Sequence, residues 1–166
     1  MTRILYLMRH AEAEKTNDSK TDFDRLLTVR GERDARYMGK MISGSPDLVL
    51  VSTATRAKKT ANIWADSLEI HLEKPRNYFL NRVIYLNQLY QASEIQLLSV
   101  IASLKDDIQS VMIIGHNPSL SDISGSLAGK PINLSTAEVI TFTIERSWRN
   151  FNMIPVTATE RIKPIC

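Results

Sequence analysis

Six residues, in three places far apart in the sequence, have side chains suited to binding and attacking a small anion. They are Arg9 and His10, Ser52 and Arg56, and His116 and Asn117. A guanidinium presents planar N–H donors that match two oxygens of a phosphate group. A neutral imidazole can attack phosphorus and depart again when it is protonated. Phosphate is therefore the natural ligand of this set, and a histidine is its natural nucleophile.

His10 is the residue that we expect to attack. Arg9 and Arg56 disfavour its charged form, so its imidazole should stay neutral at working pH, provided that no carboxylate pairs with it. The same arginines, with His116, would stabilise the charge on the equatorial phosphoryl oxygens during in-line transfer. Ser52 and Asn117 are explained equally well by contact with the ligand and by a local role, one ending a strand and the other capping a helix.

The order of apolar and polar segments predicts the elements that position these residues. Residues 4–8 and 111–114 are short apolar runs typical of strands buried on both faces, and residues 48–51 are predicted as a third strand. Helices are predicted after Thr28, over about residues 56–68, after a capping box that begins at Ser93, and from Pro118 to about residue 128. Residues 140–144 alternate, which predicts a strand with one solvated face, placed at the sheet edge. Residues 73–91 fit either a strand or a loop.

Strands that alternate with helices predict an α/β protein, a three-layer α/β/α sandwich with a mainly parallel central sheet. The length of 166 residues suits a single domain over residues 1–166. In such sheets, ligands bind beyond the carboxyl ends of the strands. The three pairs of candidate residues each follow a predicted strand, so we expect them to meet at one edge of the sheet.

Composition excludes several other classes of protein. Apolar residues make up 43% and charged residues 23%, as in ordinary globular proteins, and the basic residues behind the net charge of +3 form no cluster for nucleic acid. Residues 4–8 are too short for a signal-peptide core or a membrane span, and the single cysteine, Cys166, can form no internal disulfide. We therefore expect a cytoplasmic protein. No metal or other cofactor is expected, because no carboxylate cluster has the spacing of metal ligands.

Four ordered motifs are similar to those of a known enzyme family. They occupy residues 7–13, 25–31, 52–60 and 114–118. In this order and spacing the chain resembles the histidine phosphatase superfamily, and its length and residues 22–31 look most like the SixA-type phosphohistidine phosphatases. The resemblance extends from residue 3 to about residue 146. It implies a phosphoglycerate mutase-like fold and a hydrolase that forms a phosphohistidine intermediate. By this resemblance, His10 is phosphorylated, Arg9 and Arg56 bind phosphate, and His116 completes the pocket.

The resemblance also points to a proton-handling residue and to a departure. Asp22 matches an aspartate of SixA-type proteins and is the candidate for managing protons or water, with Glu12 and Asp24 as competing carboxylates. Relatives that cleave phosphomonoesters commonly supply a carboxylate acid from the middle of the chain, and residues 87–91 contain none. A leaving alkoxide needs a proton more than a leaving imidazole does, so this departure favours phosphohistidine as the substrate.

Several functions remain open. The first is dephosphorylation of phosphohistidine on a protein, such as the histidine phosphotransfer domain of a phosphorelay, which would place the chain in signal transduction and release inorganic phosphate. The second is hydrolysis of a small phosphomonoester. The third is a non-catalytic adaptor that binds phosphate. A mutase-type transferase is disfavoured, because such relatives carry long insertions that enclose a sugar phosphate.

Overall fold

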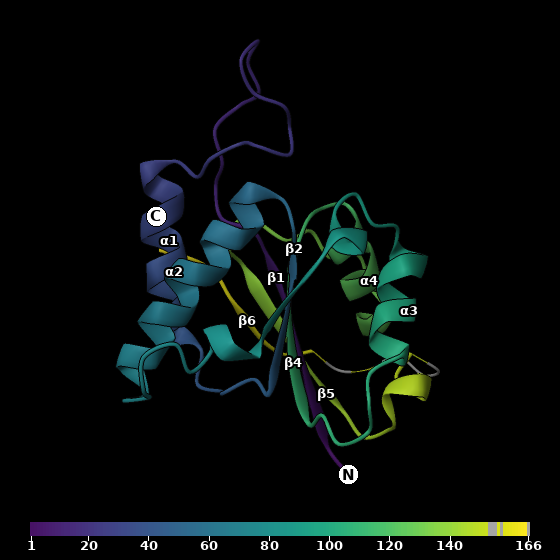
Figure 1. The fold of residues 1–166 in the computed structure, drawn as a ribbon. Coiled ribbons are helices and arrows are strands. Elements are labelled where there is room, and N and C mark those ends of the chain that lie inside the picture. The colour runs from purple at the N-terminus through teal and green to yellow at the C-terminus, as the bar shows by residue number, and fades with distance from the viewer. Residues whose placement is uncertain (153–155, 157, 166) are drawn as a thin grey trace.

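The computed structural model describes residues 1–152, 156 and 158–165, and Cys166 lies outside these ranges. The described strands form one sheet in the order β3-β2-β4-β1-β5-β6 (Figure 1). Strands β1 (Arg3–Arg9), β2 (Leu48–Ser52), β3 (Val83–Leu86) and β4 (Ser110–Gly115) are parallel. Strand β5 (Val139–Ile144) is antiparallel to β1, and β6 (Ala158–Ile162) is antiparallel to β5.

Two pairs of helices cover the two faces of this sheet. Helices α1 (Val29–Met41) and α2 (Thr55–His71) lie on one face, and α3 (Glu94–Ala102) and α4 (Ser119–Ala128) lie on the other (Figure 1). The predicted three-layer sandwich is therefore confirmed. In the described residues, no helix is both long enough and apolar enough to cross a membrane.

The continuous apolar run of β1 is explained by its central position. Tyr6 and Met8 belong to the hydrophobic cluster under α1 and α2, whereas Leu5 and Leu7 belong to the cluster under α3 and α4. Alternate side chains of a strand point to opposite faces, so a strand that is covered on both faces needs apolar residues at every position. This packing fixes the end of β1, and with it the backbone just before His10.

The start of α1 holds the segment that follows His10. Thr28 caps the helix by accepting a hydrogen bond from the backbone N–H of Gly31, and the Thr28 backbone N–H donates to the carbonyl of Glu12 at 3.0 Å. A Cβ atom on Gly31 would collide with that same Glu12 carbonyl. Glycine therefore permits the close approach that ties the first helical turn to the loop after β1.

Parallel strand register brings three candidate sites to one edge. Arg9 pairs with Gly115 between β1 and β4, and Val51 pairs with Ile114 between β2 and β4. The residues that follow these pairs therefore emerge at one level of the sheet. The predicted convergence of the three strand ends is confirmed, and α2 extends one turn beyond its predicted end, to His71.

The prediction that residues 140–144 form the sheet edge is wrong. Strand β5 pairs with β1 on one side and with β6 on the other, and five of its six residues are buried. Thr141 is buried and Thr143 is partly buried, so the alternation of residue types did not reflect full exposure to water. On this side of the sheet the edge strand is β6, which was not among the predicted strands.

Residues 73–91 contain a strand after all. Strand β3 is four residues long and lies at the opposite edge of the sheet, between the short 3₁₀ helices Leu80–Arg82 and Asn87–Leu89. Its central residues, Ile84 and Tyr85, are exposed. A short edge strand has neither a continuous apolar run nor a regular alternation, which is why its pattern was ambiguous.

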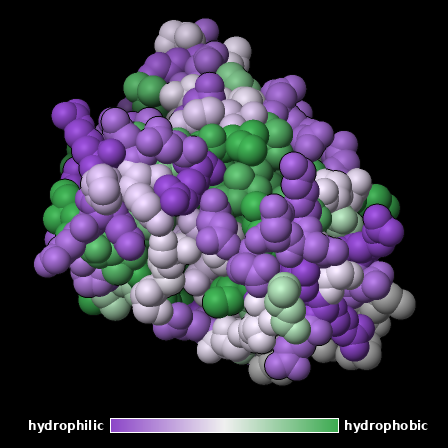
Figure 2. All heavy atoms as spheres, turned by 60° about the horizontal axis from the view of Figure 1, so that its bottom comes forward, coloured by the Kyte–Doolittle hydropathy of each residue, from purple (hydrophilic) through white to green (hydrophobic). Residues whose placement is uncertain are grey.

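Exposed large hydrophobic residues are distributed over separate elements. Val29, Ile70 and Ile95 are the most exposed of those within helices and lie on α1, α2 and α3. When the lower side of Figure 1 is turned forward, the surface is mostly hydrophilic, with a hydrophobic area above its centre (Figure 2). Single exposed apolar residues such as these three are normal for a folded domain.

Candidate active site

The backbone of His10 is held from two sides where β1 ends. Its N–H donates to the Gly115 carbonyl at 3.0 Å, and its carbonyl accepts from the Ala137 N–H at 3.1 Å. The ring Nδ1 lies 2.7 Å from the carbonyl oxygen of Ala11. Because a carbonyl oxygen can only accept, Nδ1 must carry the ring hydrogen. The lone pair is therefore on Nε2, which lies 3.3 Å from the Nε of Arg56.

His10 is held in its neutral form. Burial is the main cause that lowers its pKa from 6.5 to about 3, and the charges of His116, Arg56 and Arg9 act in the same direction, whereas the bond to Ala11 opposes them. The side chain is almost completely buried, and no carboxylate contacts it among the described residues. The imidazole is thus deprotonated at neutral pH, as a nucleophile requires.

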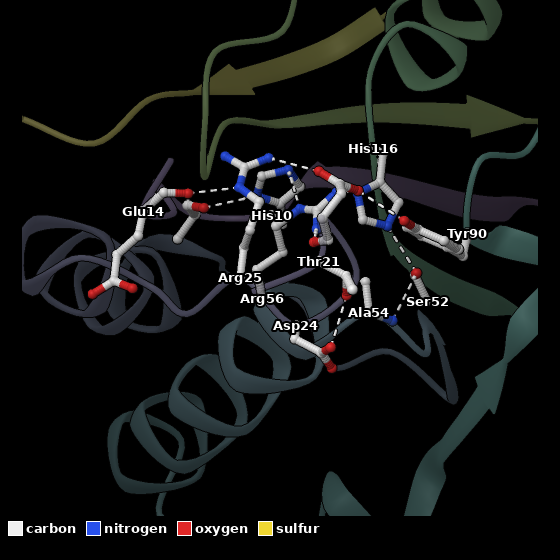
Figure 3. A network of polar contacts seen from close by, with 12 residues as sticks. His10, Glu14, Thr21, Asp24, Arg25, Ser52, Ala54, Arg56, Tyr90 and His116 are labelled. Atoms are coloured by element: carbon white, nitrogen blue, oxygen red, sulfur yellow. Dashed lines mark hydrogen bonds and ion pairs between the residues drawn. The ribbon is translucent and has the colours of Figure 1, made fainter. Parts of the chain in front are cut away.

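Arg56, in the first turn of α2, joins His10 to Asp22. Its Nη1 donates to the backbone carbonyl of Asp22 at 2.6 Å, and its Nη2 donates to the carboxylate Oδ2 at 3.1 Å. Arg25 donates to the other carboxylate oxygen at 3.0 Å, and the Tyr90 hydroxyl donates to Oδ2 at 2.8 Å (Figure 3). Asp22 thus lies at the centre of a network that includes two arginines and a tyrosine.

The network keeps Asp22 ionised. Burial raises its pKa, but the hydrogen bonds from Tyr90 and Arg25, together with the charge of Arg56, outweigh burial and lower the pKa to about 2. Tyr90 is shifted the other way, since burial and the neighbouring carboxylate raise its pKa, so its hydroxyl remains a donor. An aspartate in this state has no proton to give to a leaving group at neutral pH.

His116 lies beside His10, just after β4. The two ring centroids are 5.1 Å apart, and the Tyr90 ring packs edge-on against His116 at 5.7 Å. Its Nε2 is 2.8 Å from the hydroxyl of Ser52, whereas its Nδ1 is buried and has no hydrogen-bond partner within the described residues. Burial, and next the charge of Arg56, lower the pKa of His116 from 6.5 to about 4. His116 is therefore also neutral.

Arg9 and Asn117 meet at a different point. Arg9 Nη1 and Asn117 Nδ2 both donate to the carbonyl of Leu134, at 3.0 Å and 2.9 Å. The side-chain oxygen of Asn117 also accepts from the Ser121 hydroxyl at 2.7 Å, which commits both ends of this amide to the protein. Arg9 keeps a buried Nε without a partner in the described part of the chain. The structure thus joins His10, Arg56, Asp22, His116 and Ser52 through direct contacts, and it anchors Arg9 and Asn117 on the loop before β5.

The competing carboxylates lie elsewhere. Glu12 accepts a hydrogen bond from the Thr28 hydroxyl at 2.6 Å, and the exposed Asp24 accepts one from Thr21 at 2.7 Å. Of the three acidic candidates, Asp22 is the one that contacts Arg56. In the described residues, no three His, Cys, Asp or Glu side chains are grouped as metal ligands would be, and the absence of a metal stays a prediction.

Arg25 and Tyr90 are two site residues that sequence reasoning missed. Arg25 begins one of the four motifs, but its sequence neighbours gave no sign that it would pair with Asp22. Tyr90 lies in residues 87–91, which contain no carboxylate, and its contact with Asp22 spans 68 positions of the chain. A tyrosine between a short 3₁₀ helix and the start of α3 carries no local signal of such a contact, so only the tertiary structure reveals it.

Comparison with known proteins identifies the family of this chain. Residues 5–77 match the model of the histidine phosphatase superfamily, branch 1. A phosphohistidine phosphatase SixA homolog of Haemophilus influenzae is 30% identical over 146 residues, which cover 81% of this chain and 84% of that protein. The chain therefore belongs to the histidine phosphatase superfamily. It spans 64% of the length of an uncharacterized chloroplastic protein of Arabidopsis thaliana, to which it is 29% identical over 82% of its own residues.

Solved structures agree on the fold. The protein histidine phosphatase SixA, solved in complex with tungstate, superposes with a TM-score of 0.78 at 21% identity, covering 97% of both chains. Phosphoglycerate mutase of Plasmodium falciparum superposes with a TM-score of 0.61 at 15% identity, covering 96% of this chain and 89% of that one. The predicted phosphoglycerate mutase-like fold is confirmed.

The two neutral histidines predict a loss of stability in mild acid. The folded-state pKa values of His10 and His116, about 3 and about 4, lie below the 6.5 of an exposed histidine, so the unfolded chain binds protons first as the pH falls. We expect the free energy of unfolding, measured with urea in phosphate-free buffer, to fall between about pH 7 and about pH 4.5. His10→Gln should fall less steeply, and His71→Gln, at the exposed end of α2, should follow the wild type. Identical slopes for wild type and His10→Gln would contradict a neutral, buried His10.

Proposed function

We propose that this protein is a phosphatase that forms a phosphohistidine on His10, and that its substrate is phosphohistidine on another protein. Arg9, Arg56 and His116 would hold the transferred phosphoryl group, with the substrate in line with Nε2 of His10. Asn117 would shape the pocket through its bond to Leu134. No metal or other cofactor is part of this proposal.

The first step transfers the phosphoryl group. The lone pair on Nε2 of His10 attacks phosphorus, the P–N bond of the substrate breaks, and its electron pair returns to the substrate imidazole. That imidazole takes its proton on the remote ring nitrogen before it leaves, so it departs neutral. Nδ1 of His10 keeps its hydrogen on the Ala11 carbonyl throughout, at 2.7 Å.

The second step releases phosphate. With Nδ1 still protonated, phosphorylated His10 is itself a good leaving group. Water attacks phosphorus, the N–P bond breaks, the electron pair returns to Nε2, and both water protons leave with the phosphate. An ionised Asp22 can accept a hydrogen bond from the attacking water, which makes it our candidate for orienting that water.

The choice of phosphohistidine depends on the state of Asp22. It is the acidic side chain that contacts Arg56, and its pKa of about 2 leaves no carboxylic acid to protonate a leaving alkoxide. A leaving imidazole needs no acid at the leaving atom, so this site fits P–N cleavage better than cleavage of an ester.

The relatives support the same reading. The Haemophilus influenzae relative is named a phosphohistidine phosphatase SixA homolog, and the SixA structure holds tungstate, a tetrahedral oxyanion like phosphate. We propose a histidine phosphotransfer domain of a cytoplasmic phosphorelay as the partner, with signal transduction as the setting and inorganic phosphate as the product. Neither nucleic acid nor a membrane is part of this proposal.

The test compares two substrates for the same wild-type protein. Phosphate release is measured from a phosphohistidine-bearing relay domain and from a simple aryl phosphate, with a chelator present throughout. We expect a higher kcat/KM for the relay domain. Faster release from the aryl ester would redirect the assignment to small phosphomonoesters. Tight binding of phosphate without release from either substrate would identify an adaptor.

A further inference from the structure

The hydroxyl of Ser52 faces a histidine instead of open space. Ser52 is completely buried at the end of β2, and its Oγ accepts a hydrogen bond from the Ala54 N–H at 3.2 Å. The same oxygen lies 2.8 Å from Nε2 of His116 (Figure 3). These contacts leave Ser52 no free surface from which to touch a substrate.

The number of hydrogens decides the direction of the bond between Ser52 and His116. His116 is neutral at pH 7 because burial lowers its pKa to about 4, so its ring carries a single N–H. If that hydrogen were on Nε2, it would point at Ser52, and the serine hydrogen would be left buried with no acceptor among the described residues. If the hydrogen is on Nδ1, Ser52 can donate to Nε2 while it accepts from Ala54. In the second arrangement the one hydrogen without a protein partner is that on Nδ1, and a phosphoryl oxygen in the pocket can accept it. In the first arrangement the buried serine hydrogen stays unmet even when phosphate is bound, and unmet buried donors are costly.

We propose that Ser52 is a positioning residue that donates to Nε2 of His116 and so keeps the ring hydrogen on Nδ1, where it serves a phosphoryl oxygen. This inference rests on the proposed function, since the oxygen in question belongs to the transferred group. Nδ1 is the buried ring nitrogen without a protein partner, on a ring 5.1 Å from that of His10. In the other tautomer a lone pair would face the anion and repel it.

Removing the hydroxyl should therefore affect phosphate more than it affects the fold. In Ser52→Ala the ring hydrogen is free to move to Nε2, and the donor on Nδ1 is lost for part of the time. We expect binding of inorganic phosphate to weaken about 10-fold, and kcat/KM to fall by roughly 10- to 100-fold, less than a directly removed donor costs. Ser52→Thr keeps the hydroxyl and should restore both. Ser67→Ala is the matched control. Ser67 is also a buried serine, but it lies near the end of α2 and donates to the Arg36 carbonyl on α1.

The decisive measurement is the ¹⁵N NMR spectrum of the histidine rings in the folded wild type, with His116 assigned by comparison with His116→Gln. We expect a protonated Nδ1 and an unprotonated Nε2 for His116, and a mixture of tautomers in Ser52→Ala. A hydrogen on Nε2 in the wild type, a doubly protonated ring, or an unchanged tautomer and phosphate affinity in Ser52→Ala would overturn the proposal.

The outcome does not depend on turnover. The expected tautomer together with no phosphate release from a phosphohistidine protein would support the role of Ser52 and refute the proposed function. Phosphate release together with a hydrogen on Nε2 of His116 would support the proposed function and refute the role of Ser52.

Discussion

His10→Ala is expected to lower kcat/KM for phosphate release by on the order of 10⁴-fold or more, to the level left by the binding groups alone. The substitution removes the nitrogen that we propose attacks phosphorus, and neither neighbour can replace it. The Nε2 of His116 faces Ser52, and Arg56 has no lone pair to offer. The remaining cationic groups can still bind the phosphoryl group, so substrate affinity should change much less than turnover.

The same variant tests the covalent intermediate. Rapid quenching of the wild type with labelled substrate should trap label on the protein in a bond that is stable in alkali and labile in acid, as a phosphoramidate is. His10→Ala should trap none. His71→Ala is the matched control, since this exposed histidine at the end of α2 contacts no site residue among those described, and it should behave as the wild type. Release that survives His10→Ala would refute His10 as the nucleophile.

Arg56→Lys is expected to lower kcat/KM by about 10³-fold, nearly as much as Arg56→Ala. Arg56 uses three nitrogens of one planar group, with Nε toward His10 and the two Nη atoms toward Asp22. A lysine restores the charge, but its three N–H donors share one nitrogen, so it cannot reproduce the planar group that contacts His10 and Asp22 together. The charge alone therefore should not rescue activity.

Loss of Arg56 should also change the behaviour of Asp22. Since Arg56 is one of the groups that lower the pKa of this carboxylate, its removal should raise that pKa, which NMR titration of the Asp22 carboxyl can follow. Arg76→Lys, at an exposed position after α2, is the control and should leave both activity and titration unchanged. Wild-type kcat/KM in Arg56→Lys would show that charge and not geometry is what the site needs.

Much of this architecture follows from local signals. Doubly buried strands require apolar residues at every position, and helices require caps such as Thr28 and Ser93, so β1, β2, β4 and the four helices were predictable. The carboxyl ends of parallel strands lie at one edge of a sheet. This rule predicted from the sequence that His10, Arg56 and His116 would lie together.

The tertiary structure alone decided the remaining features. Residue types in β5 alternate as in a solvated strand, but β6 pairs with its other edge. The pairing of a strand depends on the packing of the whole sheet, which the strand's own residues do not determine. Asp22 stays ionised partly because the Tyr90 hydroxyl, 68 positions away in the sequence, donates a hydrogen bond to its carboxylate. Likewise, Ser52 faces His116 across 64 positions. Hydrogen bonds between distant side chains leave no periodic trace in a sequence. Composition and spacing therefore locate the candidate reacting groups but do not reveal the contacts that set their protonation.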